Sequence, residues 1–214
     1  MLLYLISTFS ICIPLFFGFF NYKKLSGEMK ILVWYLVSSF VFELIVNFLI
    51  LLRISRNTLW ITHVFPIIEY LFLVVIFSRW QKNIRLKKAY LWSILFIIAF
   101  MIVNVIFFQP ITQANSYGMS IHKIFLIGIS AFALLELSKE GVYPLTREYR
   151  FWVTTGVLFY NVSTLIIFSL LNMILFQDFQ FAKAVFIINT ILNIVTYLIY
   201  AEGFLCRNQA QKSG

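Results

Sequence analysis

The sequence predicts an all-α polytopic membrane protein, a bundle of seven transmembrane helices. Of its 214 residues, 62% are hydrophobic and only 12% are charged, against about 25% charged residues in an ordinary soluble domain. The apolar residues gather in continuous runs of about 20, the length that crosses about 30 Å of hydrocarbon. Barrel strands would instead alternate in polarity over about ten residues. A soluble domain, a disordered chain and a secreted disulfide scaffold are therefore excluded.

Short polar separators divide the apolar runs and define the spans in order. The separators are Asn21–Lys24, Arg53–Asn57, Gln81–Lys88, Gln109–Gln113, Ser138–Gly141 and Gln177–Asp178. We expect one transmembrane domain over 1–214, with spans at about 2–20, 31–52, 60–79, 90–108, 119–137, 152–176 and 182–204. The longest connection, around 138–151, is too short to fold alone, so no extramembrane domain is expected. Binding or chemistry then belongs to the bundle, its loops or a partner.

The basic residues predict the orientation, because cytoplasmic loops carry an excess of Lys and Arg. With the N-terminus outside and the C-terminus cytoplasmic, 13 of the 17 basic residues fall on the cytoplasmic side: Lys23, Lys24, Lys30, Arg79, Lys82, Arg85, Lys87, Lys88, Lys139, Arg147, Arg150, Arg207 and Lys212. The outside keeps only Arg53, Arg56, Lys123 and Lys183. An odd number of spans agrees with this asymmetry.

The net charge of +9 is interpreted as a topology signal and a contact for the lipid bilayer rather than for nucleic acid. The densest basic cluster is expected to face anionic lipid or an acidic cytoplasmic partner, and it consists of Arg79, Lys82, Arg85, Lys87 and Lys88. The abundance of Phe, Ile, Asn and Lys with little Ala and Gly is typical of an AT-rich bacterial genome. The expected location is therefore the bacterial inner membrane.

Two glutamates inside predicted spans are the most informative residues. A charged side chain at a helix centre costs about 2.5–3.5 kcal/mol on insertion, so Glu43 in the second span and Glu69 in the third call for an explanation. Each lies about nine residues from the outer end of its span, which places both about 13 Å below the outer surface. Because the connection is short, the two spans are expected to be antiparallel neighbours. Carboxyl groups brought close in this way would not both ionise.

Other polar side chains gather in the outer half of the spans and predict a pocket open to the outside. The expected ligand- or proton-binding residues are Glu43, Glu69, His63, Asn47, Asn189 and Asn193. Secondary candidates are His122, Lys123, Asn161 and Tyr197. The alternative is that these groups only form hydrogen bonds between helices, at roughly 0.6 kcal/mol each.

The sequence offers little for catalysis. Its only histidines are His63 and His122, its only aspartate is Asp178, and it has no HExxH, GxSxG or CxxC motif. No catalytic residue, metal site or cofactor is therefore predicted. The sequence leans away from an enzyme, although an acid/base pair of Glu43 and Glu69 stays open.

An internal repeat leaves a transporter architecture open. Val64–Glu69 resembles Val185–Asn189 with one residue omitted, and the Trp–Glu spacing of 34–43 recurs between Trp and Asn in 152–161. Such a repeat would give two parallel three-helix units joined by the fourth span. The spans contain few Gly and Pro residues, whereas transporters usually have interrupted spans. This scarcity favours a receptor-like role.

Several segments together resemble a group of small uncharacterised bacterial seven-helix integral membrane proteins. The resemblance covers most of the chain and implies seven spans, but it implies no activity. The matching segments are Trp60–His63, Ile67–Leu71, Phe151–Trp152, Gly156–Tyr160, Ile188–Asn189, Leu192–Tyr197 and Ala201–Gly203. The residues to which it points are His63, Glu69, Trp152, Tyr160, Asn189 and Asn193.

The leading hypothesis is a sensory or ligand-binding module of the inner membrane, which takes its ligand in the outward pocket. Without an output domain, it would act through a cytoplasmic or membrane signalling partner at the basic loops. The main alternative is a small-solute or proton-coupled transporter with three-plus-one-plus-three helices. A lipid-modifying enzyme and an oligomeric pore or structural subunit are less favoured, and the oligomeric state is left open.

Overall fold

The computed structural model describes residues 2–52, 58–141, 144–176 and 179–206, and this part of the chain is helical without any strand. The prediction of an all-α protein is thereby confirmed. Two short 3-10 turns, η1 (Tyr22–Lys24) and η2 (Leu145–Arg147), join longer elements. The α-helices are α1 (Leu2–Ser10), α2 (Cys12–Phe20), α3 (Gly27–Leu51), α4 (Ile61–Trp80), α5 (Ile84–Phe107), α6 (Ser116–Lys139), α7 (Tyr149–Ser169), α8 (Leu171–Phe176) and α9 (Phe179–Leu205).

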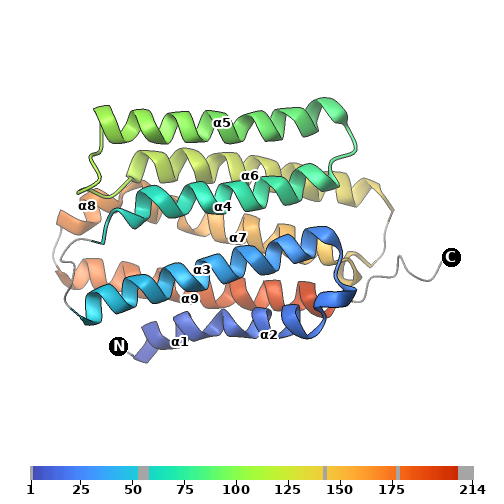
Figure 1. Cartoon of the computed structure of the whole chain (residues 1–214), viewed down its shortest axis with the longest axis horizontal. Helices are drawn as coiled ribbons and strands as arrows, with labels where there is room; N and C mark the ends of the chain where they lie inside the picture. The colour runs from blue at the N-terminus through green and yellow to red at the C-terminus, as the bar shows by residue number, and fades with distance from the viewer. Residues whose placement is uncertain (1, 53–57, 142–143, 177–178, 207–214) are drawn as a thin grey trace.

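Six helices are long and apolar enough to cross a membrane, namely α3, α4, α5, α6, α7 and α9, and Ile6–Phe20 forms a shorter apolar segment. The first predicted span, 2–20, is therefore a helix pair interrupted at Ile11. Pro14 explains the interruption, because it has no N–H to donate to the carbonyl of Ser10 and its ring crowds that carbonyl. The chain nevertheless continues in the same direction from α1 into α2 (Figure 1).

The predicted span 152–176 also divides into two helices. Helix α7 ends at Ser169, Leu170 leaves the helical conformation with φ −101° and ψ 12°, and α8 begins at Leu171. Asn172, at the start of α8, uses its side chain to bind both backbone groups of Ala114 at 3.1 and 2.8 Å. Because the helix is interrupted at Leu170, the short helix α8 packs against the connection between α5 and α6.

The helices pack side by side along one direction, as Figure 1 shows. Following the main contacts, α3 packs on α4, α4 on α6, α6 on α7, α7 on α9, and α9 on α1 and α2, which return to α3. These segments form a closed ring in chain order. Helix α5 stands outside the ring, against α4 and α6.

The two ends of the bundle differ in charge. One end, called the basic end here, contains the C-terminal ends of α2, α4, α6 and α9 and carries Lys24, Arg79, Lys82, Lys139 and Arg147. The opposite end, called the pocket end, contains the connection between α5 and α6 together with α8. Helix α1 begins at the pocket end, and α9 ends at the basic end (Figure 1).

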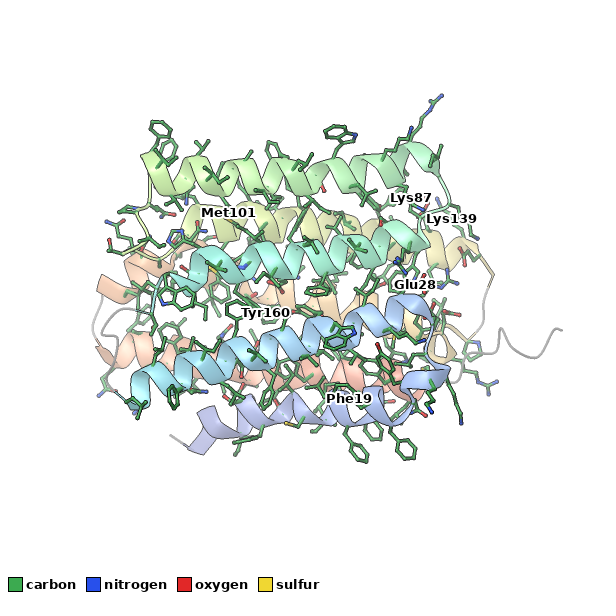
Figure 2. All side chains as sticks on the ribbon, in the orientation of Figure 1. Phe19, Glu28, Lys87, Met101, Lys139 and Tyr160 are labelled. Carbon is green, nitrogen blue, oxygen red and sulfur yellow. The ribbon has the colours of Figure 1, made fainter. Side chains whose placement is uncertain are left out.

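The outside of the bundle is apolar, as expected for a surface that contacts lipid. Large side chains project outward along its length (Figure 2). The most exposed of them are between 65% and 78% accessible: Phe16, Phe20, Trp92, Ile106, Phe107 and Ile166.

Candidate functional site

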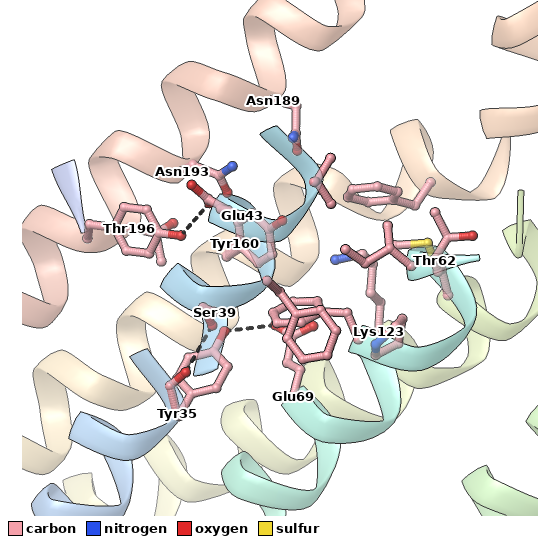
Figure 3. Close-up of a pocket in the computed structure, with 18 of the residues that line it drawn as sticks. Tyr35, Ser39, Glu43, Thr62, Glu69, Lys123, Tyr160, Asn189, Asn193 and Thr196 are labelled. Atoms are coloured by element: carbon pink, nitrogen blue, oxygen red, sulfur yellow. Dashed lines mark hydrogen bonds between the residues drawn. The ribbon is translucent and has the colours of Figure 1, made fainter. Parts of the chain in front are cut away.

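A cavity of about 250 Å³ lies inside the ring, between α3, α4, α6, α7 and α9. It occupies the half of the bundle nearer the pocket end, since its lining reaches Ile61 and Thr62 at the start of α4. Most of the predicted polar residues line it (Figure 3). Its polar lining residues are Tyr35, Ser39, Glu43, Thr62, Glu69, Lys123, Tyr160, Asn189, Asn193, Thr196, Tyr197 and Tyr200.

Glu69 of α4 is held deep in the bundle and is only 4% exposed. Its Oε1 atom accepts a hydrogen bond of 3.2 Å from the hydroxyl of Tyr35 on α3. Its Oε2 atom lies 3.3 Å from Nε2 of His122 on α6, within ion-pair distance. The ring of His122 is turned so that neither nitrogen makes a hydrogen bond of ordinary geometry in the described structure. The contact between His122 and Glu69 is therefore electrostatic, and the hydrogen bond to the Glu69 carboxyl group comes from Tyr35.

Lys123, the next residue on α6, contributes a buried ammonium group that is 1% exposed. Its Nζ atom lies 4.5 Å from the ring centroid of Tyr160 and 4.7 Å from that of Phe168, distances typical of cation–π contacts. One long hydrogen bond of 3.5 Å joins Nζ to Oδ1 of Asn161. An ammonium group has three donors, so this arrangement leaves Lys123 able to bind an anionic group in the cavity.

Glu43 of α3 forms a second polar region in the cavity. Its Oε1 atom accepts a hydrogen bond of 3.2 Å from the hydroxyl of Tyr197 on α9. Asn193 and Asn189 of the same helix lie beside it along the lining (Figure 3). Within the described ranges, Glu43 has no ion pair, and the Oδ1 atom of Asn189 is buried without a hydrogen-bond partner. This side of the cavity thus offers acceptors without a fixed cation.

The two glutamates share the cavity but have separate partners. Glu69 is bound by Tyr35 and Glu43 by Tyr197, and no hydrogen bond joins the two carboxyl groups in the part of the chain that the structure describes. The cavity therefore has two regions, one with Glu69 and Lys123 and one with Glu43.

Some predicted site residues lie outside the cavity lining. His63 is buried at the pocket end, where its Nε2 atom lies 3.0 Å from the carbonyl oxygen of Gln113. Asn47 donates from Nδ2 to Oγ1 of Thr8 at 3.4 Å and so binds α1 to α3. Two secondary candidates lie behind the lining, where His122 contacts Glu69 and Asn161 contacts Lys123.

The pocket end is held by a buried polar network. The N–H of Asn115 donates to Oγ1 of Thr62 at 3.0 Å, and Oδ1 of Asn115 accepts from Nδ2 of Asn104 at 2.7 Å. Asn115 and Asn104 are 0% and 1% exposed. Because buried amides are strongly bound only when their partners are in place, this network fixes the connection between α5 and α6. Sequence reasoning did not find it.

Tyr35 and Tyr160 are lining residues that were not predicted from residue spacing, whereas it did indicate Tyr200. Tyr35 had a detectable signal, because it precedes Ser39 and Glu43 at intervals of four on one helical face. Tyr160 was indicated only by the resemblance. Tyr200 follows Tyr197 by three residues and continues its stripe.

The predicted basic cluster lies at the basic end, where α4 ends and α5 begins. One of its members is already paired, since Nζ of Lys82 lies 2.8 Å from Oε1 of Glu140. Arg150 contacts the other oxygen of Glu140 at 2.8 Å and also Glu148 at 2.9 Å. The hydrogen bond from Arg150, with a further contribution from Lys82, holds the pKa of the Glu140 carboxyl below its ordinary value.

Among the described residues, no group of three or more His, Cys, Asp or Glu side chains is placed to hold a metal ion. A scan against protein-family models, a search of curated proteins and a search of solved structures each returned no match. The resemblance to small bacterial seven-helix proteins therefore stays a prediction, and the function has to be argued from the cavity itself.

Proposed function

We propose that the chain crosses a bacterial inner membrane seven times, with the N-terminus outside and the C-terminus in the cytoplasm. The start of α1 and the end of α9 at opposite ends of the bundle, and the basic residues at one end, support this topology. In this topology α1 and α2 together make the first crossing. Their residues Leu2–Phe20 extend about 28 Å as a helix, close to the thickness of the hydrocarbon core.

Within this topology, we propose a sensory or ligand-binding module that takes a small zwitterionic solute from the outside. The observation that carries the proposal is a cavity of about 250 Å³ in which Lys123 and Glu43 lie in separate regions. The ligand's anionic group binds the ammonium of Lys123, between the rings of Tyr160 and Phe168. Its ammonium group binds Glu43, which has no ion pair in the described residues, and the oxygen of Asn189.

A binding role without transport is favoured by the interior between the cavity and the basic end. Buried apolar side chains, each at most 4% exposed, fill this part of the bundle: Leu32, Leu36, Leu73, Phe77, Val153, Val157 and Phe204. Among the described residues, this close-packed apolar core favours binding over the passage of a polar solute. Signalling then passes through a partner at the basic end. A small-solute or proton-coupled transporter stays the second candidate, because the ring with α5 outside it fits a three-plus-one-plus-three plan.

The test measures the unfolding temperature of the purified full chain with small charged probes. The probes are the common α-amino acids and 4-aminobutyrate, compared with butyrate and butylamine, which each carry one of the two charges. A ligand that binds only the folded state stabilises it by about 2.7 kcal/mol at a hundred times its dissociation constant. We expect at least one zwitterion to raise the unfolding temperature, and neither single-charge probe to match it.

The variants E43Q and K123M remove one binding group each and are expected to abolish this shift. Glu202→Gln makes the same chemical change as E43Q at the basic end of α9 and should leave the shift intact. A shift that is unchanged in E43Q and K123M would show that the solute binds elsewhere.

A further inference from the structure

A second hollow lies on the outside of the bundle, between α5 and α6, and it is separate from the cavity described above. Its volume is about 390 Å³. Every residue that lines it is apolar or aromatic, and the lining consists of Leu86, Tyr90, Ile124, Phe125, Gly128, Ile129 and Phe132. The hollow thus forms an apolar groove that runs along two antiparallel helices and is open to the surrounding lipid.

The groove exists because α5 packs outside the ring and because α6 has a glycine there. A Cβ atom added at Gly128 would meet nothing within 4 Å. By contrast, one added at Gly156 inside the ring would lie 2.6 Å from Tyr200. Gly128 therefore does not serve close packing of helices within the described structure. Its effect is to leave room on the lipid-facing surface.

Two lysines lie where this groove reaches the basic end. Lys87 follows Leu86 of the groove lining, and Lys139 lies seven residues after Phe132, on the same face of α6. Figure 2 labels both at the same end of the bundle. Neither lysine has an ion pair among the described residues, whereas the neighbouring Lys82 is paired with Glu140. Two lysines without an ion pair among the described residues therefore lie at the basic end of an apolar groove.

We propose that an anionic phospholipid of the basic-end leaflet binds this groove. One acyl chain lies against Tyr90, Phe125 and the gap at Gly128, and the phosphate contacts the ammonium groups of Lys87 and Lys139. The length of a lysine side chain allows its charge to reach the headgroup region while its stem stays apolar. Charge complementarity selects an anionic lipid over a zwitterionic one.

The test is native mass spectrometry of the full chain, titrated with phosphatidylglycerol or with phosphatidylcholine of identical acyl chains. The wild type should retain phosphatidylglycerol with the higher affinity. The variant K87Q/K139Q should lose about thirtyfold in affinity for phosphatidylglycerol and little for phosphatidylcholine. Gly128→Leu should weaken binding of both lipids, because its side chain fills the groove. Leu also favours the helix over Gly, so this variant should fold.

The matched control is K23Q/K24Q, which removes two basic residues of the same end near α2, on the side of the ring away from α5. If this control loses as much affinity as K87Q/K139Q, the lysines only contribute general surface charge and the proposal is overturned. If Gly128→Leu binds both lipids as the wild type does, no acyl chain occupies the groove and the proposal is equally overturned.

Discussion

Charge is arranged in opposite ways in the pocket half of the bundle and at its basic end. In the pocket half, Glu69 and Lys123 are 4% and 1% exposed and contact aromatic rings and hydroxyl groups. At the basic end, Glu140 forms 2.8 Å ion pairs with Lys82 and Arg150, and the Lys82 side chain is 79% exposed. The first arrangement is enclosed by protein, and the second is partly open, since the Glu140 and Arg150 side chains are 23% and 22% exposed.

The difference indicates which charges serve a function. Exposed ion pairs cost little to form and contribute about 0–1 kcal/mol, so those at the basic end are compatible with a purely structural or topological role. Buried charges carry a desolvation penalty that their mutual attraction does not always offset. The burial of Glu69 and Lys123 is therefore not accounted for by stability alone, which is consistent with the proposal that they bind a ligand.

The largest expected effect comes from leaving one buried charge without its counterpart. Glu69→Leu keeps the side-chain volume but removes the carboxylate that lies 3.3 Å from His122 and lines the same cavity as Lys123. It also removes the acceptor of Tyr35. We expect a loss of about 3–5 kcal/mol in unfolding free energy, measured by reversible unfolding in mixed detergent micelles. The double variant E69L/K123M should recover most of this loss, because it removes both charges.

Glu140→Leu is the control at the basic end and should cost less than about 1 kcal/mol. If Glu69→Leu and Glu140→Leu lost the same unfolding free energy, the buried and the exposed charges would not differ in the way proposed.

A smaller effect is expected from Gly118, which borders the network of the pocket end. A Cβ atom there would lie 2.3 Å from Oδ1 of Asn115 and 2.4 Å from Sδ of Met101. Gly118→Ala should therefore force Asn115 from its hydrogen bonds and cost about 1–3 kcal/mol. Gly128→Ala, in the open groove, should be neutral or slightly stabilising in the same unfolding assay. A neutral Gly118→Ala would contradict the rigid packing described for this end.

The smallest effect is a pH dependence at the basic end. Because Arg150 and Lys82 hold the pKa of Glu140 below its ordinary value, the pairing contributes stability above the unfolded pKa of about 4.3. This contribution is lost as the pH falls through the lower folded pKa. The wild type should exceed Glu140→Gln in unfolding temperature at pH 7, and the two should converge as the pH falls from about 4.3 through the lower folded pKa. A difference that persists at low pH would point to packing as its source.

The sequence was sufficient to predict the helical membrane-type fold because long apolar runs have few other solutions. The interruptions at Ile11 and Leu170 were missed, since hydrophobicity is continuous across them. Pro14 indicated the interruption at Ile11 in the sequence. The second depends on Asn172 binding Ala114, a contact between residues far apart in the chain.

The candidate site was predictable in part. Glu43, Glu69, Asn189 and Asn193 line the cavity, because polar groups in apolar spans face the interior whenever they can. Asn47 does not line the cavity, although it lies one helical turn from Glu43. Four residues advance a helix by a full turn and about 40° more, which turns Asn47 toward Thr8 of α1. The helix rotation and neighbours that decide such cases are set by packing, which spacing does not reveal.

The central claim is that the cavity opens to the outside, at the pocket end, and it can be tested by cysteine labelling. In a background that carries Cys12→Ala and Cys206→Ala, Asn193→Cys places one thiol in the cavity lining. A small membrane-impermeant thiol reagent should modify it in spheroplasts but not in inside-out vesicles, and a binding zwitterion should slow the reaction. Labelling from the cytoplasmic side alone, or no labelling from either side, would contradict the account.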